Sequence, residues 1–131
     1  MVPMRIVLLA HGSPTPGWQR FLLQVAKNVS LRLGADYVRV AYLEFLSPDL
    51  FEIANEAVSQ NHRSLRVLPV FLGSGKHVNH DIPRRVAEAR QRFPDLQIEL
   101  RANLGDDPRL LALIETLALE SALNERVDWP A

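Results

Sequence analysis

The 131-residue sequence contains no cysteine, which excludes disulfide bonds and metal sites built from thiolates. A metal ion would have to be held by histidine and carboxylate groups, which exchange their ions more readily. Net charge is also absent, because 15 basic and 15 acidic residues cancel, so nothing favours nucleic acid or an anionic membrane as a partner. No apolar run reaches membrane-spanning length and the first residues show no signal-peptide pattern, so we predict a cytoplasmic protein.

The composition that remains is that of an ordinary globular chain, with 47% hydrophobic and 23% charged residues. This length is enough for one domain with a real core and too short for two. We therefore predict a single domain over residues 1–131, with a tail from about residue 124.

Strand-like and helix-like segments alternate along the chain. Strands are predicted at residues 4–10, 37–45, 67–72 and 96–100, and the segments between and after them carry apolar residues at helical spacing. The predicted helix starts are Thr15-Pro16, Ser47-Pro48, Ile82-Pro83 capped by Asp81, and Asp107-Pro108, and Gly34 is predicted to end the first helix. This order predicts an α/β fold, a three-layer sandwich around a four-stranded parallel sheet with flavodoxin-like topology.

Two histidines follow buried strands at the same edge of this predicted sheet. The first strand runs directly into His11-Gly12-Ser13, and His77 follows the third strand after a glycine-rich turn. Ligands bind just outside the carboxyl ends of parallel strands, and imidazole is both a metal ligand and a base near neutral pH. A single histidine at such a position more often has its hydrogen bonds satisfied by the backbone of its own turn. Two histidines at one edge favour a functional site.

Other polar residues near this edge leave alternatives open. Glu44 ends the second predicted strand and could bind a cation, relay protons or simply face water. Ser47 is a helix cap by default, although its hydroxyl could also meet an anionic ligand. His80 either joins His77 on one ion or is exposed, and His62 at the opposite edge is predicted to face solvent.

Two phosphate-binding motifs are imperfect matches. Gly73-Ser74-Gly75-Lys76 lacks the first glycine and the final Ser or Thr of a P-loop. Ala10-His11-Gly12 lacks the arginine that holds phosphate beside the histidine of histidine phosphatases. Phosphoryl transfer is therefore disfavoured.

Four sequence blocks together resemble one protein family. They are the His11-Gly12-Ser13 strand end, Leu43-Glu44-Phe45, PVFLGSGKHVNHDIP at residues 69–83 and LGDDPR at residues 104–109. Over residues 5–118 the chain resembles the short CbiX-type sirohydrochlorin cobaltochelatases and ferrochelatases of the class II chelatase family. The resemblance implies a chelatase-like fold, a homodimer, and insertion of Co²⁺, Fe²⁺ or Ni²⁺ into sirohydrochlorin, with the metal as a substrate and no organic cofactor.

The resemblance also implies roles for individual residues. It makes His11 a metal ligand and proton acceptor and His77 the second metal ligand, with Glu44 as a further catalytic candidate. The implied substrate-binding residues are Ser47, Leu72, Gly73, Ser74, Gly75, Lys76 and His77. Ser47 occupies a position where some members place a glutamate that contacts the macrocycle. The rival interpretation is a non-catalytic metal or tetrapyrrole carrier, or half of a hetero-oligomeric chelatase.

Overall fold

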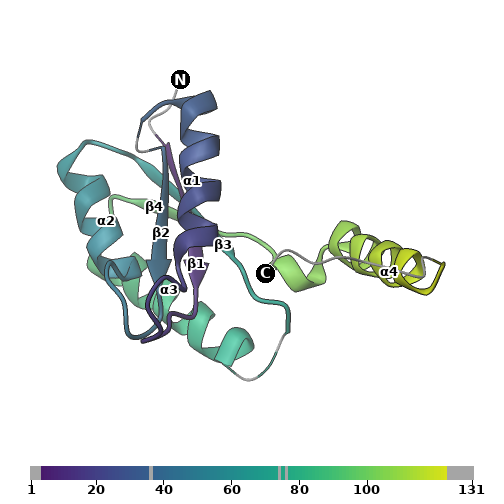
Figure 1. The fold of residues 1–131 in the computed structure, drawn as a ribbon. Coiled ribbons are helices and arrows are strands. Elements are labelled where there is room, and N and C mark those ends of the chain that lie inside the picture. The colour runs from purple at the N-terminus through teal and green to yellow at the C-terminus, as the bar shows by residue number, and fades with distance from the viewer. Residues whose placement is uncertain (1–3, 36, 74, 76, 124–131) are drawn as a thin grey trace.

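The computed structural model describes residues 4–35, 37–73, 75 and 77–123 and confirms the predicted α/β fold class (Figure 1). The strands are β1 (Met4–Ala10), β2 (Val38–Tyr42), β3 (Ser64–Pro69) and β4 (Gln97–Leu100). The helices are α1 (Arg20–Leu33), α2 (Leu50–Ser59), α3 (Ile82–Arg92) and α4 (Pro108–Leu123), with a π-helical turn η1 (His77–Asp81) before α3 and a short 3-10 turn η2 (Leu104–Asp106) before α4. The predicted tail from residue 124 lies outside the described residues, and the single domain stays a prediction.

All four strands are parallel and follow the order β2-β1-β3-β4, so β1 lies in the middle of the sheet. Parallel strands point the same way, and the segments that follow the four strands therefore meet at one edge, here called the carboxyl edge. These segments begin at residues 11, 43, 70 and 101. The fold thus gathers at one edge the strand ends on which the predicted site depends.

One face of the sheet is covered by α2 and α3. Its core residues are Val7, Leu9, Ala41, Leu65, Val67 and Ile98 from the strands, and Leu50, Ile53, Ala54, Ala57, Ile82, Val86 and Ala89 from the helices. Full burial of one large aliphatic side chain stabilises a fold by about 1.5–3 kcal/mol. This layer therefore supplies most of the hydrophobic stabilisation of the sheet.

The opposite face is covered by α1, which packs on β1 and β2. Its core residues are Leu8, Ala10, Ala26, Val38, Val40 and Tyr42. Beyond α1, the same face of β3 and β4 is open: Arg66 and Glu99 are about half exposed and form an ion pair at 3.2 Å. Half of this face therefore has no helix over it among the described residues.

The first helix begins later than predicted. The sequence places its start at Thr15-Pro16, but α1 begins at Arg20. Gly17 adopts a φ of 79°, a left-handed conformation that a right-handed helix cannot contain. At the other end Gly34 ends the helix, as predicted.

The second and third strands also differ from their predicted bounds. β2 ends at Tyr42, because Phe45 turns the chain with a φ of 68°. β3 begins earlier than predicted, at Ser64. The exposed Arg66 interrupts the apolar run from which the strand was predicted. The strand ends at Pro69. Just beyond this end, the backbone N–H of Phe71 donates to the side chain of Asn103 and not to a neighbouring strand.

Two predicted helix caps are wrong. Asp49, and not Ser47, caps α2, because the Asp49 carboxylate accepts a hydrogen bond from the backbone N–H of Glu52 at 2.8 Å. The Ser47 hydroxyl donates instead to the Glu52 carboxylate at 3.0 Å. Asp81 has helical backbone angles and makes no side-chain cap bond, since η1 already forms a helical turn before α3.

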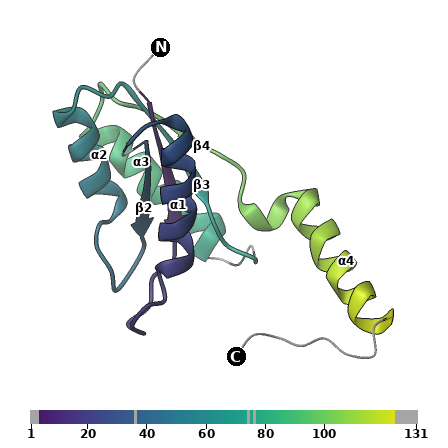
Figure 2. The same cartoon turned by 45° about the horizontal axis from the view of Figure 1, so that its top comes forward.

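Helix α4 stands away from the rest of the described chain (Figures 1 and 2). None of its residues is buried. Its large exposed side chains are Leu111, Leu113, Ile114, Leu117, Leu119 and Leu123, each between 46% and 82% exposed. No helix in the described part of the chain is long and apolar enough to cross a membrane.

A buried arginine joins β1 to α2. Arg5 is 1% exposed, and its guanidinium donates to Glu56 at 2.8 Å, while Glu56 also accepts from Arg39 at 3.2 Å. The same guanidinium contacts Gln60 and lies 3.5 Å from Nε2 of His62. The prediction that His62 faces solvent is therefore wrong: it is partly buried, and burial together with the Arg5 charge lowers its pKa.

Two glutamates that each join two arginines provide a matched test of this network. Glu56→Gln leaves the buried Arg5 without its counter-charge, so we expect the free energy of unfolding to fall by about 2 kcal/mol. Glu99→Gln makes the same chemical change between the exposed Arg66 and Arg101, where water screens the charges, and should change stability little. Urea denaturation of both variants measures the difference, and equal losses would contradict a special role for the buried pair.

Candidate functional site at the carboxyl edge

The ends of β1 and β2 bring His11 and Glu44 together. The N–H of Leu43 donates to the carbonyl of Ala10 at 3.0 Å, and that of Glu44 donates to the carbonyl of His11 at 2.9 Å. These bonds continue the β1–β2 pairing past the strands and place both side chains on the carboxyl edge. Nε2 of His11 lies 3.8 Å from a Glu44 carboxylate oxygen, with both side chains about half exposed.

The hydrogen bond of the other ring nitrogen assigns the tautomer of His11. Nδ1 lies 3.0 Å from the carbonyl oxygen of Gly12, which can only accept. Nδ1 therefore carries the hydrogen in the neutral ring, and the lone pair of Nε2 is free on the side of Glu44. A free imidazole lone pair beside a carboxylate can ligate a divalent cation or accept a proton.

Gly12 permits the close approach of the two strand ends. A Cβ at this position would lie 1.8 Å from the carbonyl oxygen of Glu44, far inside any allowed contact. Gly12 also has a φ of 96°, which favours glycine. The spacing between His11 and Glu44 therefore depends on a residue without a side chain.

The segment after β3 is held in place by the segment after β4. The Asn103 side chain accepts from the N–H of Phe71 at 3.0 Å and donates to the carbonyl of Gly73 at 3.4 Å. The N–H of Gly105 donates to the carbonyl of Phe71 at 2.9 Å, and a Cβ on Gly105 would lie 2.2 Å from the carbonyl oxygen of Leu72. This support leaves the Leu72 side chain 74% exposed.

The predicted substrate-binding turn is described only in part. A Cβ added at Gly73 or Gly75 would meet no atom within 4 Å, so the backbone is open to a ligand there. Ser74 and Lys76 lie outside the described residues. The backbone of His77 begins η1, but its side chain also lies outside the description, so its pairing with His11 stays a prediction.

Other predicted residues lie apart from the His11–Glu44 pair. The Ser47 hydroxyl is engaged with Glu52, and His80 is exposed within η1. In the part of the chain that the structure describes, no three His, Asp or Glu side chains gather closely enough to hold a metal ion by themselves.

Sequence reasoning missed three residues at this edge. Asn103 and Gly105 support the segment that follows β3. Phe45, the residue after Glu44 in the chain, has a side chain that is 65% exposed. A signal for the first two was present, because a polar residue and then a glycine follow the fourth strand at the edge shared with His11. Phe45 was part of the Leu43-Glu44-Phe45 block, but nothing in the sequence indicated that its ring is exposed, since its positive φ depends on the turn that ends β2.

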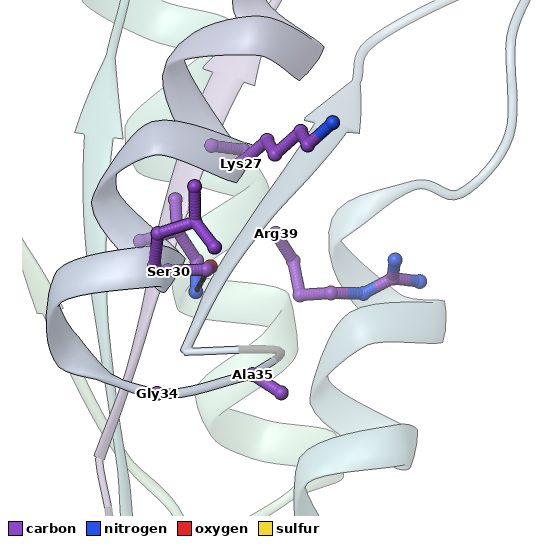
Figure 3. A pocket seen from close by; sticks show the side chains of 8 residues that line it. Lys27, Ser30, Gly34, Ala35 and Arg39 are labelled. Atoms are coloured by element: carbon purple, nitrogen blue, oxygen red, sulfur yellow. Dashed lines mark hydrogen bonds between the residues drawn. The ribbon is translucent and has the colours of Figure 1, made fainter.

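A surface hollow of 480 Å³ lies away from this edge, between the last turns of α1 and the start of β2 (Figure 3). It is lined by Lys27, Ser30, Gly34, Ala35 and Arg39, among others. The Ser30 hydroxyl accepts from the N–H of Val38 at 3.3 Å, and Arg39 is paired with Glu56. Ser30 thus joins α1 to β2, Arg39 joins β2 to α2, and the hollow shares no residue with the carboxyl edge.

Parallel strands that present a histidine and a carboxylate at their carboxyl ends define an α/β protein with a candidate cation-binding edge. The family model for CbiX matches residues 5–121, and the chain belongs to this family. The resemblance predicted from the sequence is thereby confirmed.

Named relatives and a solved structure agree with this membership. A sirohydrochlorin cobaltochelatase of Methanocaldococcus jannaschii is 34% identical over 60% of this chain and 55% of its own length, so the chain matches little more than half of that relative. One from Sulfurisphaera tokodaii is 27% identical over 84% of this chain and 87% of its own length. The crystal structure of a protein described as a cobalamin biosynthesis CbiX protein of Marinobacter aquaeolei is 29% identical, with a TM-score of 0.78 over 92% of this chain and 98% of that one.

A further structural neighbour shows the fold alone. The sirohydrochlorin chelatase SirB of Bacillus subtilis, whose structure is in complex with cobalt, is 22% identical with a TM-score of 0.74. The match covers 89% of this chain and 50% of SirB.

Two glycines with positive φ provide a matched test of the strand-end contact. A Cβ at position 34 would meet no atom within 4 Å. Gly34→Ala should therefore lower the free energy of unfolding only by the cost of backbone strain, on the order of 1–3 kcal/mol. Gly12→Ala adds a clash with the backbone of Glu44 and should lower the free energy of unfolding by more than Gly34→Ala does. Chemical denaturation compares the two variants, and an equal or smaller loss for Gly12→Ala would show that the strand ends separate freely.

Proposed function

We propose that this protein inserts a divalent metal ion, Co²⁺ or Fe²⁺, into sirohydrochlorin. The observation that carries the proposal is the free Nε2 of His11, 3.8 Å from the Glu44 carboxylate at the carboxyl edge of a CbiX-family fold. Relatives of this chain are named sirohydrochlorin cobaltochelatase and sirohydrochlorin ferrochelatase. The metal ion is a substrate of the proposed reaction, and no organic cofactor is required.

The chemistry of insertion explains why a histidine and a carboxylate belong at this edge. When a divalent ion enters the macrocycle, two pyrrole N–H bonds break and two protons leave. Nε2 of His11 first shares its lone pair with the ion. Once the ion has passed to the ring nitrogens, the same lone pair accepts one of the two pyrrole protons, and the other passes to water. The nearby Glu44 carboxylate stabilises the imidazolium that results. His77 is the proposed second ligand.

The exposed groups of the same edge suit a flat, anionic macrocycle. Leu72 and Phe45 present apolar side chains that are 74% and 65% exposed, which can cover the ring faces. Gly73 and Gly75 leave backbone open at the turn. Lys76 is the proposed cationic partner for the carboxylates of sirohydrochlorin.

The active unit is proposed to be a homodimer. The chain covers 55% of the Methanocaldococcus jannaschii relative and 50% of SirB, so two copies would together approach the size of one such protein. The same coverage keeps open the second candidate function, half of a hetero-oligomeric chelatase. Metallation by the purified chain alone separates the two.

The central experiment is a metallation assay. Purified protein is mixed with sirohydrochlorin and Co²⁺ at a mildly alkaline pH, and the absorption change is followed against the spontaneous rate. We expect turnover well above the spontaneous rate. If the folded protein gives a rate no higher than the spontaneous one with both Co²⁺ and Fe²⁺, the chain alone is not a chelatase. The remaining interpretations would then be a non-catalytic carrier or half of a hetero-oligomeric chelatase.

The role of His11 is tested at saturating metal. His11→Ala removes both a ligand and the proton acceptor, so we expect a rate about 100-fold lower even where excess Co²⁺ restores binding. His80→Ala, a matched change at an exposed histidine, should have little effect. If excess metal restores the His11→Ala rate, His11 is only a ligand, and Glu44 becomes the next candidate for the proton acceptor.

The proposed role of His77, whose backbone begins η1, is tested by substitution. His77→Ala should abolish most metallation, because the proposed ion loses its second ligand. Circular dichroism checks that the variant keeps its helix content. A variant with intact dichroism and unchanged turnover would contradict the assignment.

A further inference from the structure

Asn103 is one of two buried polar side chains in the described part of the chain. The other, Arg5, is paired with Glu56 on α2, whereas Asn103 lies just beyond β4 at the carboxyl edge. Asn103 is 8% exposed. Burial of a polar amide costs free energy unless its atoms are hydrogen-bonded. The partners of Asn103 therefore show what the buried amide does.

The two ends of the Asn103 amide bind backbone groups on either side of Leu72. Its Oδ1 accepts from the N–H of Phe71 at 3.0 Å, and its Nδ2 donates to the carbonyl of Gly73 at 3.4 Å. An N–H can only donate and a carbonyl can only accept, so these partners fix the orientation of the amide. One side chain thus holds the backbone before and after Leu72.

The same segment after β4 also holds the carbonyl groups of this turn. The N–H of Gly105 donates to the carbonyl of Phe71 at 2.9 Å. A Cβ on Gly105 would lie 2.2 Å from the carbonyl oxygen of Leu72, so the two backbones are in close contact there. Gly105 is held in turn by η2, where the N–H of Asp106 donates to the carbonyl of Asn103 at 3.0 Å. The backbone of residues 71–73 is therefore fixed by residues 103–106.

This turn lies beside the segment that carries His11. The N–H of Val70 donates to the carbonyl of Leu9 at 2.9 Å, so the pairing of β1 with β3 continues past the end of β3. Leu72 follows two residues after Val70, and His11 follows two residues after Leu9. At 74% exposed, the Leu72 side chain contributes little hydrophobic stabilisation to the fold, but a ligand that covers it would gain that contribution.

We propose that Asn103 is a positioning residue that orders the turn in advance, so that Leu72 supports the macrocycle beside His11. The proposal rests on the proposed function and deepens it by naming a residue that determines macrocycle affinity. A flexible turn would lose conformational entropy when the macrocycle binds, and this loss would weaken binding. Because the bonds of Asn103 already restrict the turn, less entropy is lost. Asn103 is itself buried and acts through Leu72.

The first test measures the binding of metal-free sirohydrochlorin through its fluorescence. Asn103→Leu keeps the approximate size of the side chain and removes both bonds, so we expect the dissociation constant to rise about 10-fold. Water can reach the freed groups at this partly exposed turn, so circular dichroism should show an intact fold. Asn28→Leu is the matched control, because Asn28 is exposed on α1, and it should leave the dissociation constant unchanged.

A double-mutant cycle tests whether Asn103 acts through Leu72. Leu72→Ala alone should weaken binding, because an apolar contact with the macrocycle is lost. In the Leu72→Ala chain, Asn103→Leu should weaken binding by at most about 2-fold more, because the side chain that it positions is already absent. A purely structural role of Asn103 would give the same loss in both chains. If Asn103→Leu does not fold, Asn103→Ser takes its place in every comparison.

Hydrogen exchange at the backbone N–H of Phe71 provides a readout that needs no macrocycle. This N–H is bonded to Asn103, so its exchange should be faster in Asn103→Leu than in the wild type. Leu72→Ala leaves the bond in place and should leave this exchange unchanged. Unchanged exchange in Asn103→Leu would show that Asn103 does not order the turn, and would overturn the proposal.

The binding results separate failure of this proposal from failure of the proposed function. If the wild type binds sirohydrochlorin and Asn103→Leu binds it equally well, the positioning role is wrong and the proposed function stands. The same conclusion follows if Asn103→Leu weakens binding equally with and without the Leu72 side chain. A folded wild-type chain that binds no sirohydrochlorin would contradict both, and this result is seen before any substitution is made.

Discussion

The pairing of β1 with a parallel neighbour on each side is the constraint on which the site depends. β1 is hydrogen-bonded to β2 and β3 along its length, and its inward side chains, Val7 and Leu9, are fully buried. A strand held in this way cannot shift by one residue without moving its apolar side chains to the wrong face. The position of His11, one residue beyond the strand, is therefore fixed by packing that has nothing to do with its chemistry.

The same constraint explains how an exposed pair of side chains acquires a defined geometry. The side chains of His11 and Glu44 are each about half exposed. Their separation is set by backbone bonds between the two strand ends and by the space that Gly12 leaves at their crossing. Asn103 performs a similar task for the turn that carries Leu72, because it binds backbone on both sides of that residue. Backbone support of this kind holds exposed side chains in a defined geometry.

The sequence by itself determined the alternation of strands and helices, the parallel sheet and the strand-end positions of His11 and Glu44. These follow from local hydrophobic periodicity and from residues adjacent in the chain, which is why the glycine at position 34 was predicted to end its helix. Only the tertiary structure decided the features that depend on distant residues. The support of Phe71 by Asn103, the burial of His62 against Arg5 and the contact of Gly12 with Glu44 each join segments far apart in sequence. Such contacts leave no periodic trace, because each depends on where two separate chain segments meet in space.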